Sequence, residues 1–151
     1  MRSLIIKMSH NDLSEKMYRE HILELYKNPS NFGEIKNPTH KHTETNSLCG
    51  DEITVQMIIK NGKVSDVKFN GSGCVISMVS SSLLTDKIKG MKIEDIKKLT
   101  KKDMLKLLNI KINPARLKCA LLSLDAVKKT LSPLKQNQGN VTRSKIKGGL
   151  N

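Results

Sequence analysis

The sequence contains no tryptophan, and aromatic residues make up only 3% of its 151 residues. Leucine, isoleucine, valine and methionine must therefore fill most of the interior. Proteins that bind single-stranded nucleic acid stack the bases on aromatic side chains set among basic residues. Here the four aromatic residues are scattered along the chain. The sequence thus argues against a nucleic-acid-binding module of that kind.

Acidic residues are also scarce, with 14 Asp and Glu against 27 Lys and Arg, for a net charge of +13. Such a charge attracts nucleic acid, an anionic surface or an acidic protein. Because neither aromatic platforms nor a recognisable reading helix accompany the charge, nucleic acid is the least favoured of these partners. We expect the basic surface to serve docking to an acidic protein.

Long apolar runs are absent. A membrane-spanning helix needs about 20 apolar residues, and a signal peptide needs a run of about 7–15. The first residues offer only Leu4-Ile5-Ile6. Three cysteines, an odd number at wide spacing, do not form a disulfide framework. We therefore expect a cytoplasmic protein with no membrane partner.

The length suits one domain with a real core. We expect a flexible lead-in at residues 1–11, a single domain at 12–134 and a disordered basic tail at 135–151. The tail has glycines and lysines but little apolar material. No internal repeat is present.

The apolar spacing changes between period 3.6 and period 2 along the domain. Helices are predicted at about 12–26, 75–89, 93–98, 101–108 and 114–131, and strands at 41–48, 52–59 and 64–69. Asp12 with Glu15 resembles a capping box that opens the first helix. Asn61-Gly62 is a strong hairpin signal. A plain two-residue loop would place Asp66 opposite Met57, so a bulge or a longer turn is expected.

The order of helix, strands and helices predicts an α+β domain, with a small antiparallel sheet and helices on one side. Every cysteine falls at a segment boundary in this scheme. Cys49 precedes a strand in Cys49-Gly50-Asp51, Cys74 follows Gly71-Ser72-Gly73 and precedes a helix, and Cys119 lies in the first turns of the last helix. A helix N-terminus favours a thiolate, and Lys118 adds a positive charge beside Cys119.

Single cysteines are often inert, buried residues, but this constellation favours a metal site. No CxxC pair exists, which disfavours zinc ribbons, ferredoxins and thioredoxin-like proteins. Three thiolates and the Asp51 carboxylate suit a tetrahedral metal such as Zn²⁺. They also suit a [2Fe–2S] cluster that the weak ligand Asp51 leaves transferable, although the spacing alone favours a metal site more than a cluster. The four histidines (His10, His21, His40 and His42) are interpreted as packing or surface residues.

At these residues the chain resembles the NifU-type and IscU-type iron–sulfur scaffold proteins, particularly the branch found in SUF systems. The resemblance runs from about Met17 to Leu131. Its segments are Tyr18–Leu23, Tyr26–Pro29, Asn31–Gly33, Cys49–Asp51, Gly71–Cys74 with the serine-rich helix, and Ala115–Ala120. The three cysteine motifs stand in the family's order and rough spacing.

The resemblance implies a three-stranded antiparallel sheet backed by helices, with the cysteines converging at one end. It implies Cys49, Cys74 and Cys119 as cluster or metal ligands, with Asp51 as the labile ligand. It also implies a cysteine desulfurase as the sulfur donor and apo iron–sulfur proteins as acceptors. Cys119 would be the leading candidate for persulfide acceptor, with Lys118 as a stabiliser of its thiolate.

Two functions follow from the resemblance. One is a non-enzymatic scaffold that assembles a transient [2Fe–2S] cluster and passes it on. The other is a zinc-dependent sulfurtransferase, in which Zn²⁺ holds the same four groups and Cys119 takes sulfur from the desulfurase. Lys118 in place of a histidine favours the second. The segment 75–118 is too short for the insertion typical of the SUF branch, which favours the first. A basic nucleic-acid-binding module is the least favoured reading.

Overall fold

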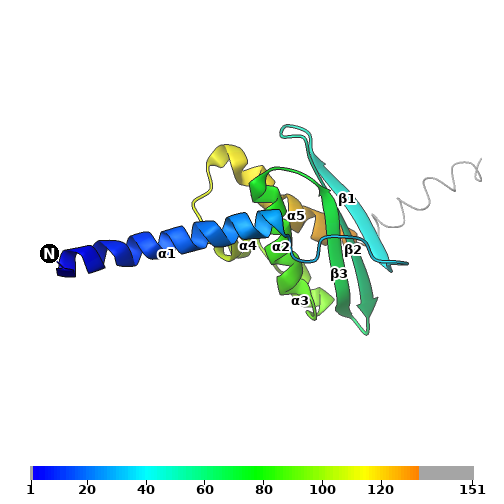
Figure 1. Ribbon diagram of the computed structural model, residues 1–151. Helices are drawn as coiled ribbons and strands as arrows, with labels where there is room; N and C mark the ends of the chain where they lie inside the picture. The colour runs from blue at the N-terminus through cyan, green and yellow to red at the C-terminus, as the bar shows by residue number, and fades with distance from the viewer. Residues whose placement is uncertain (1, 133–151) are drawn as a thin grey trace, which may run out of the picture.

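The computed structural model describes residues 2–132, with side chains from residue 15 onward. The elements are α1 (Arg2–Lys27), β1 (His40–Asn46), β2 (Asp51–Lys60), β3 (Lys63–Ser72), α2 (Val75–Ile88), α3 (Ile93–Lys97), α4 (Lys101–Leu108), the 3-10 turn η1 (Pro114–Arg116) and α5 (Leu117–Thr130). The strands form one antiparallel sheet in the order β1-β2-β3. Figure 1 shows the helices gathered on one side of this sheet. The predicted α+β class with a three-stranded antiparallel sheet is confirmed.

The start of the first helix was predicted wrongly. Helix α1 begins at Arg2 and passes through Asp12 without a break, so residues 2–11 are helical. The end was predicted well, because Asn28-Pro29 follows Lys27 directly. The helix is fixed to the body by buried Ile22 and Leu25, and the Tyr18 hydroxyl donates a hydrogen bond to the Leu108 carbonyl. The predicted tail at 135–151 lies outside the described residues.

The hairpin between β2 and β3 confirms both parts of its prediction. Asn61 and Gly62 form the two-residue turn with positive φ angles of 52° and 74°, the pattern of a type I′ turn. The register then shifts between Ile58 and Ile59, so that Met57 pairs with Val67. The extra residue is a β-bulge, which restores the apolar side chains of β3 to the buried face.

The core lies between that face of the sheet and helices α2 and α5, which contact it. The residues it buries almost completely are Ile53, Val55, Met57, Val67 and Phe69 from the sheet and Val79, Leu84, Ala120, Leu124 and Val127 from the helices. Each large apolar side chain contributes about 1.5–3 kcal/mol on burial. This packing fixes the ends of the strands and helices that carry the cysteines.

Helix α2 packs against α1 and α5, and its small polar residues are buried. Ser77, Ser80, Ser81 and Ser82 are completely buried. The Ser81 hydroxyl donates to the Ser77 carbonyl at 2.8 Å, which satisfies one hydroxyl within the helix itself. Their small volume allows the close approach of neighbouring helices that the sequence predicted.

The short helices begin where the capping residues predicted. Thr100 and Asp103 form a reciprocal capping box at the start of α4. Asn113 caps the next segment, but Pro114 opens the 3-10 turn η1, and the α-helix itself starts at Leu117. Between Cys74 and the start of α5 at Leu117 the chain forms α2, α3, α4 and η1.

Gly71 is the backbone position of β3 that tolerates a side chain least. Its φ is +134°, and a Cβ there would lie 2.0 Å from the Glu52 carbonyl oxygen. We expect Gly71→Ala to cost about 3 kcal/mol or more of unfolding free energy, from the clash and the backbone strain together. Gly62→Ala is the matched control, because its φ is +74° but its Cβ meets open space. It should cost only about 1–2 kcal/mol. Equal urea midpoints for the two variants would refute this account of Gly71.

Candidate metal centre

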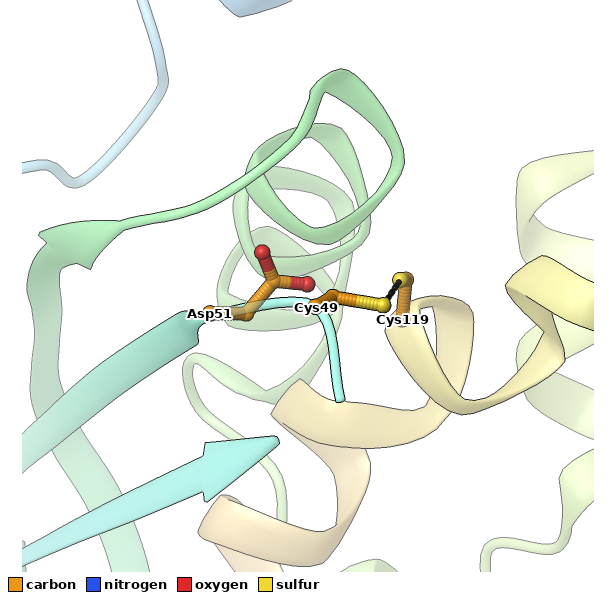
Figure 2. Close-up of side chains that lie close together, drawn as sticks. All are labelled: Cys49, Asp51 and Cys119. Carbon is orange, nitrogen blue, oxygen red and sulfur yellow. Dashed lines mark hydrogen bonds between the residues drawn. The ribbon is translucent and has the colours of Figure 1, made fainter. Parts of the chain in front are cut away.

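Three segments that are distant in sequence meet at one end of the sheet. The β1–β2 loop carries Cys49, and β2 begins with Asp51. The N-terminus of α2 carries Cys74, and the first turn of α5 carries Cys119. Figure 2 shows Cys49, Asp51 and Cys119 pointing toward one another from the loop, the strand and the helix. The convergence that the resemblance implied is therefore present in the fold.

The Cys49 loop is held by Asn46, the last residue of β1. The Asn46 carbonyl accepts hydrogen bonds from the backbone N–H groups of Cys49 (3.2 Å) and Gly50 (2.8 Å). The Asn46 side-chain Oδ1 also accepts one from Leu48 N–H at 3.3 Å. These contacts make a tight turn that leaves Cys49 exposed beside the buried end of the sheet.

Asp51 is a buried carboxylate, with only 3% of its surface exposed. Its Oδ1 accepts a hydrogen bond from Cys74 N–H at 3.1 Å. Cys74 is the N-cap of α2, so this carboxylate lies at the positive end of a helix dipole. The hydrogen bond and the dipole offset the cost of burying a charge. They also join the β2 end to the Cys74 segment.

The side-chain atoms form a compact donor set. The Cys119 thiol donates to Cys49 Sγ across 3.3 Å, and the ligand atoms of Cys49, Asp51 and Cys119 all lie within 4.8 Å of one another. Cys74 is not part of that triangle, but its Sγ lies 3.9 Å from Asp51 Oδ2. Three sulfur atoms and one oxygen are the donor types that zinc and iron–sulfur centres use, so the residues present fit either group.

Gly73 connects the end of β3 to Cys74 and passes close to the side chains of Ser77 and Asp51. A Cβ at residue 73 would lie 2.3 Å from Ser77 Oγ and 3.1 Å from Asp51 Oδ1. A side chain there would therefore force the Ser77 hydroxyl to move and would crowd the Asp51 carboxylate. This position explains the second glycine of the Gly71-Ser72-Gly73-Cys74 segment.

The sequence predicted that the helix N-terminus and Lys118 favour a Cys119 thiolate, and burial acts against that preference in the metal-free protein. Cys119 lies in the first turn of α5, at the predicted segment boundary, but it is buried, with 1% of its surface exposed. Burial, first of all, and then hydrogen bonding to Cys49 raise the pKa of the Cys119 thiol well above its ordinary value. These effects outweigh the helix N-terminus that the sequence suggested. A bound metal cation would reverse this preference, since it binds the thiolate.

Lys118 is exposed and lies at the rim of a hollow of about 450 Å³ beside the Cys49 loop. Within the described part of the chain it shows no hydrogen bond or ion pair with a thiol. The histidines with described side chains stay outside the donor set. His42 Nε2 lies 2.9 Å from Glu44 Oε1, and the ring of His21 contacts Tyr18.

The sequence analysis missed Asn46. Its signal is local, because an Asn that ends a strand commonly accepts the N–H group two residues later in an Asx turn. The position three residues before Cys49 could have been recognised on that ground.

The three thiols should differ in reactivity. At pH 8 we expect iodoacetamide to label exposed Cys49 about tenfold or more faster than Cys119, because burial and the raised pKa leave Cys119 protonated. The rate at Cys119 should rise with pH well above 9. Peptide mass spectrometry of the metal-free protein measures both rates. Equal rates at pH 8 would contradict the burial of Cys119.

Within residues 2–132, no helix is long and apolar enough to cross a membrane.

Comparison with known proteins places the chain in a family. Residues 17–141 match the NifU-like N terminal domain. The chain is 36% identical over 150 residues to the zinc-dependent sulfurtransferase SufU of Bacillus subtilis, covering 88% of this chain and 100% of that protein. It is 35% identical over 126 residues to the iron-sulfur cluster assembly enzyme IscU of Drosophila melanogaster, covering 81% of this chain and 80% of that protein.

Solved structures agree. The crystal structure of a protein described as an iron-sulfur cluster assembly scaffold for the SUF system, from Fervidobacterium islandicum AW-1, superposes with a TM-score of 0.65 at 27% identity. The match covers 74% of this chain and 93% of that one. The chain therefore belongs to the NifU-like N-terminal domain family of iron–sulfur cluster assembly scaffold proteins.

Proposed function

We propose that this protein is a scaffold on which an iron–sulfur cluster is assembled before transfer to apo-proteins. The single observation that carries the proposal is the convergence of Cys49, Asp51 and Cys119 within 4.8 Å, with Cys74 held against Asp51. Iron and sulfide are cargo in this reaction, and a cysteine desulfurase supplies the sulfur.

The donor set suits a cargo that must leave. Thiolates bind iron strongly, whereas a carboxylate is a harder and weaker ligand for it. Exposed Cys49 provides the side from which an acceptor can reach the cluster. Buried Cys119 and Asp51 provide the anchored side. The proposed ligands are Cys49, Asp51, Cys74 and Cys119.

The gaps in the two alignments favour the scaffold over the sulfurtransferase. The match to the Bacillus SufU spans 150 aligned positions, which take in all of that protein but only 88% of this chain. The Bacillus protein therefore has residues with no counterpart here. The match to the Drosophila IscU spans 126 aligned positions and takes in 81% of this chain, so nearly every aligned position has a residue here. This agrees with the absence of an insertion between Cys74 and Cys119.

A zinc-dependent sulfurtransferase is the second candidate. It is favoured by the compactness of the Cys49, Asp51 and Cys119 donors, which one tetrahedral ion could bridge. In that reaction the Cys119 thiolate would attack the outer sulfur of the desulfurase persulfide. The S–S bond of the donor breaks, its cysteine leaves as thiolate, and Cys119 carries the new persulfide. Lys118 is the candidate stabiliser of the attacking thiolate.

The net charge of +13 supports a partner with an acidic surface. An acidic desulfurase fits this requirement and would be attracted over a distance of about 8–10 Å at physiological salt.

Anaerobic reconstitution with ferrous iron, cysteine, a cysteine desulfurase and dithiothreitol tests the proposal. Two sulfane sulfurs take up four electrons to become sulfide: the two ferrous ions give one each as they become ferric in the [2Fe–2S] cluster, and the reductant supplies the other two. We expect equal amounts of bound iron and acid-labile sulfide and a [2Fe–2S] absorption spectrum. Cys49→Ala, Cys74→Ala and Cys119→Ala should each lose about tenfold or more of both, because removing a ligand costs at least as much as removing its support.

Ser72→Ala is the control for these variants, because it lies beside the site without belonging to the donor set. It should load like the wild-type protein. One tight zinc, no labile sulfide and a faster desulfurase would instead support the sulfurtransferase and contradict the scaffold.

Asp51→Ala tests the labile ligand separately. If Asp51 opens the coordination position through which the cluster leaves, the variant should assemble a cluster and transfer it about tenfold more slowly to an apo-ferredoxin. The physical reason is that the carboxylate no longer alternates between binding and leaving the metal. Transfer is followed by circular dichroism in the visible range.

Asp95→Ala serves as the matched control, because Asp95 lies exposed on α3. It should transfer at the wild-type rate. A cluster lost faster from Asp51→Ala than from the wild-type protein would overturn the assigned role.

A further inference from the structure

Asn46 has one polar group that the fold leaves unused. Its Oδ1 accepts from Leu48 N–H, but its Nδ2 is buried and has no hydrogen-bond partner in the described part of the chain. The residue as a whole is only 8% exposed. A buried donor without an acceptor costs free energy. An acceptor that reaches Asn46 Nδ2 in another state of the site would remove that cost.

The sheet register identifies that acceptor. Asn46 pairs directly with Asp51 across β1 and β2. Directly paired residues of an antiparallel sheet point to the same face, with their Cβ atoms about 4.5–5.5 Å apart. The Asn46 amide is therefore within reach of the Asp51 carboxylate by side-chain rotation alone. In the present arrangement that carboxylate is turned to Cys74 N–H instead.

The sulfur of Cys49 is a second candidate acceptor for the Asn46 amide, because Cys49 lies in the turn that begins at Asn46. Thiolate sulfur is a weak acceptor compared with a carboxylate oxygen. The Cys49 side chain is also exposed, whereas Asp51 and Asn46 are both buried. The burial and the direct pairing favour Asp51.

We propose that Asn46 is a positioning residue that sets how readily Asp51 leaves a bound metal. Its Nδ2 donates to the Asp51 carboxylate when that group swings off the metal, and so stabilises the open state of the site. The carboxylate then has two resting places, one against Cys74 N–H within the donor set and one against Asn46. This inference rests on the proposed function only in taking Asp51 as a metal ligand.

Asn46→Thr separates the two roles of the side chain. The threonine hydroxyl keeps an acceptor for Leu48 N–H, as in the equivalent turns formed by Thr, and a methyl group replaces the amide donor. The probe is the zinc-loaded protein mixed with a chromogenic chelator, which requires no cluster assembly. We expect zinc release to slow by about tenfold, the effect of one hydrogen bond to a charged group.

Asn70→Thr is the matched control. It removes an amide that donates to the Gly33 carbonyl, away from the donor set, and should leave zinc release unchanged. Added to Asp51→Ala, the Asn46→Thr change should have no effect, because Asn46 acts through Asp51. A merely structural role in the Cys49 loop would persist in that background.

Wild-type release from Asn46→Thr, or an equal effect with and without Asp51, would overturn the inference. Because this readout involves neither iron nor sulfide, failure here is distinct from failure of the scaffold proposal.

Discussion

The site depends on one buried hydrogen bond, from Cys74 N–H to the Asp51 carboxylate at 3.1 Å. A carboxylate that is 3% exposed is costly to bury unless donors and a favourable dipole surround it. The N-terminus of α2 supplies both. The bond therefore couples the electrostatics of Asp51 to the position of Cys74. It fixes the start of β2 against the N-terminus of α2. Cys49 and Cys119 lie beside this contact.

The register of the sheet decides which side chains lie near the contact between Asp51 and Cys74. The β-bulge beside Ile58 keeps Val67 and Phe69 on the buried face, and the same alternation brings Asn46 and Asp51 together at the other end of β2. A shift by one residue would turn Asp51 away from α2 and α5. The apolar core and the candidate metal centre thus depend on the same pattern of pairing.

Much of this could be predicted from the sequence, because the signals are local. Asn61-Gly62, Thr100 with Asp103, and Asn113-Pro114 each act within one turn of chain and marked real boundaries. A plain two-residue loop would have paired the charged Asp66 with the apolar Met57, and this mismatch predicted a bulge or a longer turn. The three cysteines drew attention because each stands at a predicted segment boundary, and the resemblance supported Asp51 as the fourth donor.

What could not be predicted depends on distant contacts. The capping pattern at Asp12 did not start a helix, since the preceding residues continue the helical chain from Arg2. The burial of Cys119 comes from packing of α5 against strands far away in sequence, and no local pattern reports it. The pairing of Asn46 with Asp51 needs the strand register, which the sequence left open. These same tertiary contacts set the pKa of Cys119 and the environment of Asp51.

The central claim is that Cys49, Asp51, Cys74 and Cys119 form one centre for the assembling cluster. The most direct measurement is an anaerobic crystal structure of the reconstituted protein, with anomalous scattering recorded at the iron edge. The account predicts iron enclosed by these four side chains at the end of the sheet, with the Cys74 segment still joined to β2. Iron bound elsewhere, or a disulfide between Cys49 and Cys119 in a protein that still carries its cluster, would contradict it.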